Sequence, residues 1–153
     1  MRILPFVLAL LAPAAAAAAD DVSLSSEIFV ERAKQDSRGK TVVVREVPGV
    51  VTPGDRLLFV LNYRNAGSQP AVGFTVTNPM PGAVSFAEAE GDGAVVSVDG
   101  GKSWGALAAL SIALPDGTSR PAAAADVTHV RWSFAQPIAA GNSGKLSFRG
   151  VVK

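Results

Sequence analysis

Three carboxylates near the middle of the chain have the spacing that best suits metal binding. Glu88, Glu90 and Asp92 alternate along the sequence, so on an extended chain their side chains point the same way. Carboxylate oxygens suit a hard cation such as calcium. The same pattern also suits a row of solvated charges on an edge strand, where charge discourages pairing with other chains. We favour the solvated charges and keep these three residues as the candidate metal ligands.

The single histidine is the other residue that could carry chemistry. A Ser-His-Asp triad needs a serine beside His129, and the sequence contains no nucleophile elbow to supply one. On a strand, His129 lies on the face opposite Val130 and Trp132, which predicts a surface histidine. With one His and no Cys, a zinc site would need carboxylates or water for its other ligands. We therefore predict no catalytic residue, no cofactor and no transition metal.

The segment from Ser97 to Trp104 reads Ser-Val-Asp-Gly-Gly-Lys-Ser-Trp. It resembles the Asp-box of sialidase-like propellers and other extracellular proteins, Ser-x-Asp-x-Gly-x-Thr/Ser-Trp. The resemblance implies a hairpin turn in which Asp99 accepts backbone N–H bonds and Trp104 packs beneath, with Ser97 and Gly101 shaping the turn. A propeller would repeat the box at a fixed period. One copy therefore indicates a structural turn and no glycosidase chemistry.

Aromatic side chains provide a carbohydrate-binding platform when two rings are exposed side by side. Tyr63 and Trp132 share the inward parity of their strands, which predicts that both pack in the core. Trp104 is the aromatic residue that we expect to be partly exposed.

These residues must be positioned by short strands, because Gly and Pro interrupt the chain at short intervals after residue 19. The clearest strand is 56–65, where Leu57, Phe59, Leu61 and Tyr63 alternate on one face. The other predicted strands are 27–33, 41–47, 71–78, 83–88, 94–98, 127–134 and 145–152. About one strand per dozen residues predicts an all-β, antiparallel sandwich of seven to eight strands.

Residues 105–126 are the least determined part of the chain. Residues 106–114 are apolar enough for a strand or a helical turn, and Pro121 followed by four alanines is able to start a short helix. No segment has a long 3.6-residue period, so the class remains all-β.

Two turns bound the clearest strand. Before it, Pro53 fixes φ, Gly54 supplies a conformation that a side chain resists, and Asp55 can bond the turn backbone. After it come Asn65 and Gly67, which we expect to form a turn because both residue types tolerate positive φ.

Several elements follow one another in a recognisable order: Pro53-Gly54-Asp55, the strand 56–65, Asn65-Ala66-Gly67, residues 74–78 and Pro79-Met80-Pro81-Gly82. This order resembles the bacterial Ig-like repeat family known as domain of unknown function eleven. Ala140 to Gly144 before the last strand also fits. The resemblance covers roughly residues 41–153 and implies an Ig-like sandwich, an extracytoplasmic setting and no catalytic residue. The chain departs from the family in having one copy, in Asn78 where Asp is frequent, and in the insertion at 105–126.

The first residues have the features of a secretory signal peptide. Arg2 precedes the apolar run 3–11, and Ala17-Ala18-Ala19 satisfies the small-x-small cleavage rule. We predict cleavage after Ala19 and a periplasmic or extracellular protein with no stable membrane anchor, since no lipobox Cys is present. The organisation is then a signal peptide at 1–19, an N-terminal strand and linker at 20–40, and the Ig-like domain at 41–153.

The composition supports a small domain without a strong electrostatic partner. Of the residues counted in the 48% apolar fraction, sixteen lie in the first nineteen positions. Removing Arg2 leaves 13 basic and 13 acidic residues, a balance that argues against nucleic-acid binding. We expect a non-enzymatic structural or protein-interaction module whose partner is an unknown envelope protein or glycan. The alternatives are a carbohydrate- or calcium-binding module and a small hydrolase.

Overall fold

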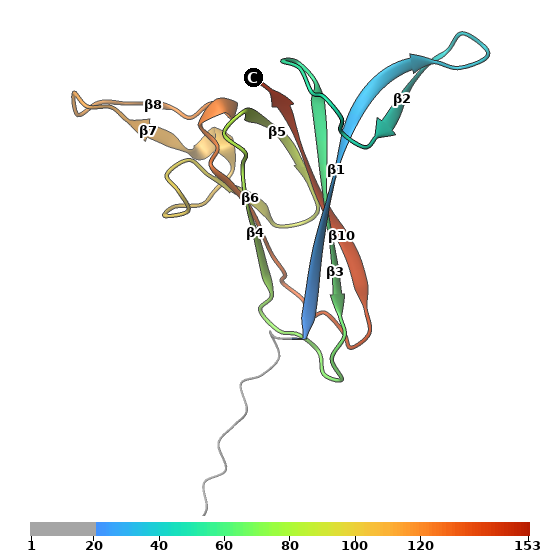
Figure 1. Ribbon diagram of the computed structural model, residues 1–153. Coiled ribbons are helices and arrows are strands. Elements are labelled where there is room, and N and C mark those ends of the chain that lie inside the picture. The colour runs from blue at the N-terminus through green and yellow to red at the C-terminus, as the bar shows by residue number, and fades with distance from the viewer. Residues whose placement is uncertain (1–20) are drawn as a thin grey trace, which may run out of the picture.

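The computed structural model describes residues 21–153, so the signal-peptide prediction lies outside the described residues. The described chain is all-β and antiparallel, as the sequence predicts, and two sheets face each other in a sandwich of the Ig-like kind (Figure 1). Ten strands are present, two of them in a hairpin that lies outside both main sheets. No helix among these residues has the length and hydropathy to span a membrane.

The large sheet has five strands in the order β2-β1-β3-β10-β5. Their bounds are β1 (Val22–Gln35), β2 (Thr41–Glu46), β3 (Arg56–Asn65), β5 (Val84–Glu90) and β10 (Ser143–Val152). β1 pairs with β3 along its first part and with β2 along its last part, the two partners overlapping at Val30 and Glu31. The strand indicated at 27–33 is therefore longer than expected and belongs to the main sheet.

The small sheet has the order β4-β9-β6, formed by β4 (Thr75–Pro79), β6 (Ala94–Ser97) and β9 (His129–Ser133). The strand predicted at 71–78 begins only at Thr75, because Gly73 has a φ of +66° and Ala71 forms a single bridge with Ile138. His129 and Val130 point to opposite sides of β9, as the alternation predicts.

The core lies between the two sheets and is built from the inward side chains of the predicted alternation. Phe59 of β3 and Phe148 of β10 stack with ring centroids 4.4 Å apart, and Trp132 of β9 lies 6.2 Å from Phe148. Trp132 is fully buried, and its indole N–H donates to the Glu90 carbonyl at 2.9 Å. Tyr63 packs against the core edge-on to Phe134. The core placement predicted for Tyr63 and Trp132 is thus confirmed.

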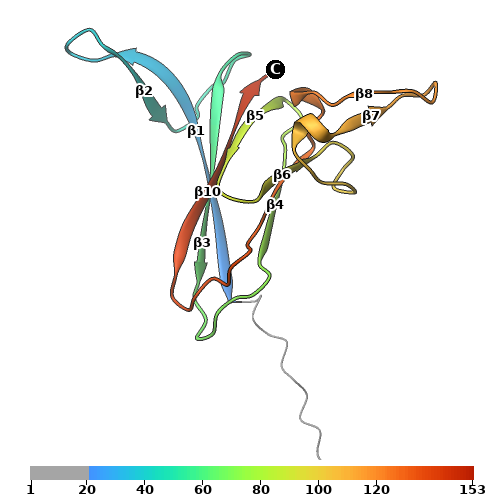
Figure 2. The same ribbon diagram turned by 180° about the vertical axis from the view of Figure 1, so that it is seen from behind.

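Residues 105–126 contain the 3-10 turns η1 (Leu107–Ala109) and η2 (Ala124–Asp126) and the hairpin of β7 (Ser111–Ala113) and β8 (Ser119–Pro121). Residues 106–114 thus contain both a helical turn and a strand. A short helical turn does follow Pro121 on the way to Asp126, as predicted, but it is the 3-10 turn η2 and begins only at Ala124, because Pro121 itself ends β8 and pairs with Ser111. This hairpin and the β1–β2 hairpin project from the same end of the sandwich in opposite directions (Figures 1 and 2).

Candidate interaction surfaces

The outer face of the large sheet carries a group of ionic side chains around Arg149 of β10. The Arg149 guanidinium binds Glu31 of β1 twice, from Nε to Oε2 at 2.9 Å and from Nη2 to Oε1 at 3.2 Å. Its Nη1 contacts Glu90 and Glu88 of β5. Arg45 of β2 approaches Glu31 to 3.4 Å. This Arg149 cluster (Glu31, Arg45, Glu88, Glu90 and Arg149) connects four strands over β3.

The centre of the Arg149 cluster is largely shielded from water. The side chains of Arg149 and Glu31 are 12% and 8% exposed, and Leu58, which pairs with Arg149 in the sheet register, is 2% exposed. Hydrogen bonds from Arg149 lower the pKa of Glu31 and of Glu90, and these carboxylates raise the pKa of Arg149. The charges on this face therefore neutralise one another.

Two of the three candidate metal ligands belong to this cluster. Glu90 also accepts a hydrogen bond from Ser147 Oγ at 2.7 Å, and Glu88 lies 3.5 Å from Arg56. The alternation stops before Asp92, because β5 ends at Glu90 and the next residue, Gly91, has a φ of +104°. Within residues 21–153, no three acidic or histidine side chains are grouped so as to hold a metal ion. Glu88 and Glu90 act here as partners of arginine.

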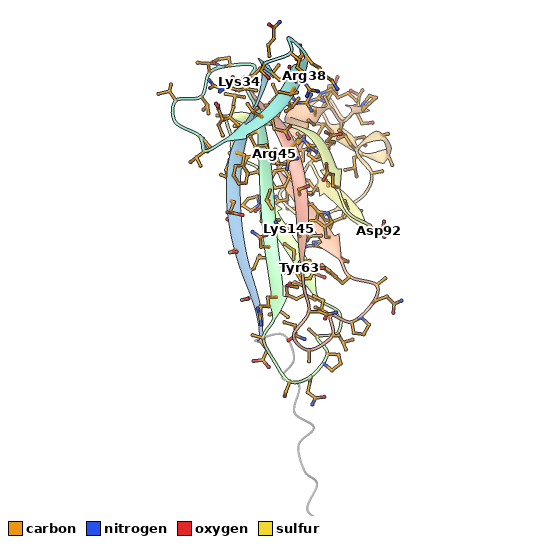
Figure 3. The ribbon with its side chains drawn as sticks, turned by 90° about the vertical axis from the view of Figure 1, so that its right-hand side faces the viewer. Lys34, Arg38, Arg45, Tyr63, Asp92 and Lys145 are labelled. Carbon is orange, nitrogen blue, oxygen red and sulfur yellow. The ribbon has the colours of Figure 1, made fainter. Side chains whose placement is uncertain are left out.

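Two hollows are lined by residues that Figure 3 labels along this side of the molecule, among them Arg45, Tyr63, Asp92 and Lys145. The first, of about 390 Å³, is lined by Leu58, Val60, Glu90, Lys145 and their neighbours. The second, of about 380 Å³, lies beside Tyr63 and Phe134. Among the described residues, no buried polar side-chain atom is left without a partner.

The Ser97–Trp104 turn is held by its own side chains. Asp99 accepts hydrogen bonds from the backbone N–H of Lys102 at 3.0 Å and of Ser103 at 2.9 Å, and from Ser103 Oγ at 2.6 Å. Ser97, fully buried, donates to Asp99 at 2.7 Å and accepts from the Gly101 N–H at 2.8 Å. These bonds hold the pKa of Asp99 far below its usual range. The carboxylate is therefore committed to the turn.

Trp104 is partly buried on the outer side of the small sheet, and one face of its ring is covered. The Arg131 guanidinium carbon lies 3.6 Å from the ring centroid, a cation–π contact. The His129 ring meets Trp104 edge-on at 6.2 Å, and its Nδ1 lies 3.0 Å from Thr128 Oγ1. A sugar stacking on this face would have to displace Arg131, so Trp104 and its neighbours form a packed cluster in this structure.

The turns that flank β3 differ in how they use their residues. Before β3, Gly54 has a φ of +93° and Asp55 accepts from the Thr52 N–H at 2.9 Å, as expected. After β3, the expectation of positive φ is wrong. Asn65 is fully buried, and its Nδ2 donates to the carbonyls of Gln69 and Ile138, both at 2.8 Å. Gly67 is required by close approach, since a Cβ there would lie 2.5 Å from Asp21 Oδ2.

Exposed apolar side chains are concentrated in one part of the chain that the sequence reasoning did not single out. Seven large hydrophobic side chains of residues 21–153 are exposed, and all of them except Val72 lie between residues 24 and 51. Val47 and Val50, after β2, are 81% and 84% exposed. Leu24 and Ile28 lie on β1 with the core-facing parity of Val30. The apolar residues at even positions from Val22 to Val30 were the available sequence signal.

Comparison with known proteins adds no relative to this description. No family model matches the chain, and no curated protein and no solved structure shows significant similarity to it.

Proposed function

We propose that this protein is an exported, non-enzymatic Ig-like module of the cell envelope that binds a protein partner through residues 24–51. The observation that carries the proposal is the concentration of exposed apolar side chains in that segment, at the β1–β2 side of the large sheet. Apolar surface that stays exposed in a folded domain gains free energy when a partner covers it.

The other surfaces support this choice. The outer face of the large sheet uses its charges within the Arg149 cluster. The outer side of the small sheet uses Asp99 within its own turn and stacks Arg131 on Trp104. These polar groups are bound within the fold, whereas six of the seven large exposed hydrophobic side chains of the described residues lie between residues 24 and 51.

The non-enzymatic and exported parts of the proposal rest on separate observations. Of the candidates for chemistry, Glu88 and Glu90 are bound by Arg149 and His129 contacts Thr128, while Asp92 lies beyond the end of β5 and away from the direction of the other two carboxylates. Export is supported by the signal-peptide pattern of residues 1–19.

The test is site-specific photocrosslinking in cells that express the full sequence. A photoreactive amino acid at Val47 should give a crosslinked protein in the envelope fraction, while the same group at Ser68, exposed in the β3–β4 loop, should not. Each product is to be identified by mass spectrometry. Absence of any product at Val43, Val47 and Val50, or equal products at Ser68, would overturn the proposal.

A further inference from the structure

The first part of β1 is an edge whose backbone groups have no neighbour among the described residues. The Ala66 N–H donates to the Asp21 carbonyl at 2.9 Å, so residues with the parity of Asp21 direct their backbone groups toward β3. The even-numbered residues of β1 therefore direct theirs away from β3. From Val30 onward these groups meet β2. Leu24, Ser26 and Ile28 have no strand beside them within residues 21–153.

The other edges of the two main sheets carry features that discourage pairing, whereas the first part of β1 carries few. Charged residues, prolines, bulges and short length are the usual protections of an edge strand. The pairing of β1 with β3 is regular from Val22 to Glu31, and residues 22–30 contain one charged side chain, Glu27. The protections elsewhere are Arg45 and Glu46 in β2, Glu88, Glu90 and a bulge in β5, Pro79 in β4, and the four-residue length of β6.

The sequence of this edge is complementary to itself when two copies run antiparallel about Ser26. In that register Leu24 of one copy faces Ile28 of the other, and Ser26 faces Ser26. The outward N–H and C=O groups of these three residues would all be paired, because they form the hydrogen-bonded positions of the new ladder. Glu27 faces Ser25, so no like charges are directly opposed.

Two further features of the structure fit this register. Leu24 and Ile28 are 48% and 43% exposed on the core-facing side of the sheet, and direct cross-strand contact would cover both. Pairing beyond the central segment stops where Val30 already meets Glu46 of β2. The end of β2 therefore closes the free edge after Phe29 and disfavours registers centred nearer to β2 than Ser26.

From this geometry we propose that the partner at this edge is a second copy of the chain. The two β1 strands pair antiparallel about a two-fold axis at Ser26 and join two five-stranded sheets into one continuous sheet. This inference rests on the proposed function and deepens it, since it names the partner of one part of residues 24–51. The interaction uses main-chain pairing for affinity and the Leu24–Ile28 contact for register.

The first test compares Ser26→Pro with Ser26→Ala in protein purified from cells that express the full sequence. Proline removes the outward N–H of Ser26, and an edge position tolerates proline because that N–H makes no bond within the chain. Light scattering should give a dimer mass for the unsubstituted and Ser26→Ala proteins and half that mass for Ser26→Pro. Circular dichroism checks that all three retain the fold. A monomer mass for the unsubstituted protein at high micromolar concentration would overturn the proposal.

The second test fixes the register and does not depend on proline being tolerated. The chain has no Cys, so one introduced thiol reports on one position. Facing residues in a hydrogen-bonded antiparallel pair have Cα atoms about 5.5 Å apart, within disulfide range, so Ser26→Cys should form a disulfide-linked dimer under mild oxidation. Leu24→Cys should not, because its own copies would be offset by about 13 Å along the strands.

The outcomes separate this inference from the proposed function. Crosslinking of Leu24→Cys as readily as Ser26→Cys would overturn the register. A monomeric protein with no Ser26→Cys dimer, but with a photocrosslink from Val47 to a different protein, would overturn the second copy as partner and leave the interaction function standing. Loss of both signals would overturn both.

Discussion

The outer face and the β1 edge of the large sheet differ in whether their polar groups have partners within the chain. On the face, Arg149 binds Glu31 above the buried Leu58, so charged groups are satisfied inside the chain. On the edge, Leu24 and Ile28 are about half exposed and their outward backbone groups have no neighbouring strand among residues 21–153. A face that satisfies its own charges contributes to folding, whereas an open edge gains free energy only from a partner. Substitutions on the face should therefore change stability, and substitutions on the edge should change association.

The largest effect is expected from Arg149→Gln. The change leaves Glu31 largely buried with only the longer contact to Arg45, and an uncompensated buried charge destabilises a protein by about 3 kcal/mol. Chemical denaturation measures the free energy of unfolding. The matched control is Arg56→Gln, whose side chain is 54% exposed beside Glu88 and should cost less than about 1 kcal/mol.

A second substitution sharpens this result. Adding Glu31→Gln to Arg149→Gln should recover part of the lost free energy, because no isolated carboxylate then remains on the face. Equal losses for Arg149→Gln and Arg56→Gln would mean that the face is no more shielded than ordinary protein surface.

Acid should weaken the face and leave the edge unaffected. On the face, hydrogen bonds from Arg149 lower the pKa of Glu31 and Glu90; away from it, in the segment 105–126, Arg120 lowers the pKa of Asp126 to about 2. A carboxylate whose pKa is lower in the folded state stabilises the fold above its unfolded pKa of about 4 and loses that contribution as the pH falls through the folded value. The free energy of unfolding should thus be level above about pH 5 and fall between about pH 4 and pH 2.

Urea denaturation across this range, with light scattering in parallel, measures both properties. The dimer mass should persist to about pH 4, since main-chain pairing does not titrate. Stability that rises on acidification would contradict the ion-pair account. Arg149→Gln should have a flatter pH profile than the unsubstituted protein.

Ser97→Ala tests whether the polar groups on the outer side of the small sheet also stabilise the fold by bonding to one another. Ser97 is fully buried, and its hydroxyl links the Asp99 carboxylate to the Gly101 N–H. Leaving that N–H without an acceptor should lower the free energy of unfolding by about 1 to 2 kcal/mol. Ser103→Ala is the control, because Ser103 is exposed and should give a smaller loss. A smaller loss of unfolding free energy for Ser97→Ala than for Ser103→Ala would mean that the exposed Ser103 hydroxyl, and not the buried Ser97 hydroxyl, stabilises the turn.

The smallest change in folding is expected at the edge. Leu24→Ser removes a side chain that is 48% exposed, so thermal unfolding at low protein concentration should indicate a change of less than about 0.5 kcal/mol. At high concentration the same substitution should lower the fraction of dimer. A large loss of monomer stability would mean that Leu24 belongs to the core and would break the contrast between face and edge.

Local sequence features predicted the strands whose side chains alternate most clearly. The limits of β3 agree with the prediction, and the inward parity of Tyr63 and Trp132 was correct. Alternation predicts a strand that includes residues 71–74, because Val72 and Phe74 share a parity with Val76, but Gly73 adopts positive φ and β4 begins only at Thr75. The alternation of side chains alone does not reveal that the backbone turns between two apolar residues.

The candidate sites were less predictable, because their meaning depends on partners far along the chain. From the sequence, Glu90 is a candidate metal ligand. The strand order places Arg149 of β10 beside it, although the two residues are 59 positions apart in the chain. Asn65 reads as a turn residue until Ile138, 73 residues on, accepts its hydrogen bond. Neither contact can be predicted from the spacing of residues within a short segment.

The sequence by itself determined the all-β class, the parity of the core residues, the outward position of His129 and the turn at Gly54, because alternation and turn chemistry are properties of neighbouring residues. Only the tertiary structure decided which charges meet and which edge stays open. Glu31 and Arg149 are 118 residues apart and become neighbours because β1 and β10 both flank β3. The edge from Ser23 to Phe29 is open because β2 pairs only with the far end of β1, and strand order is a property of the whole chain.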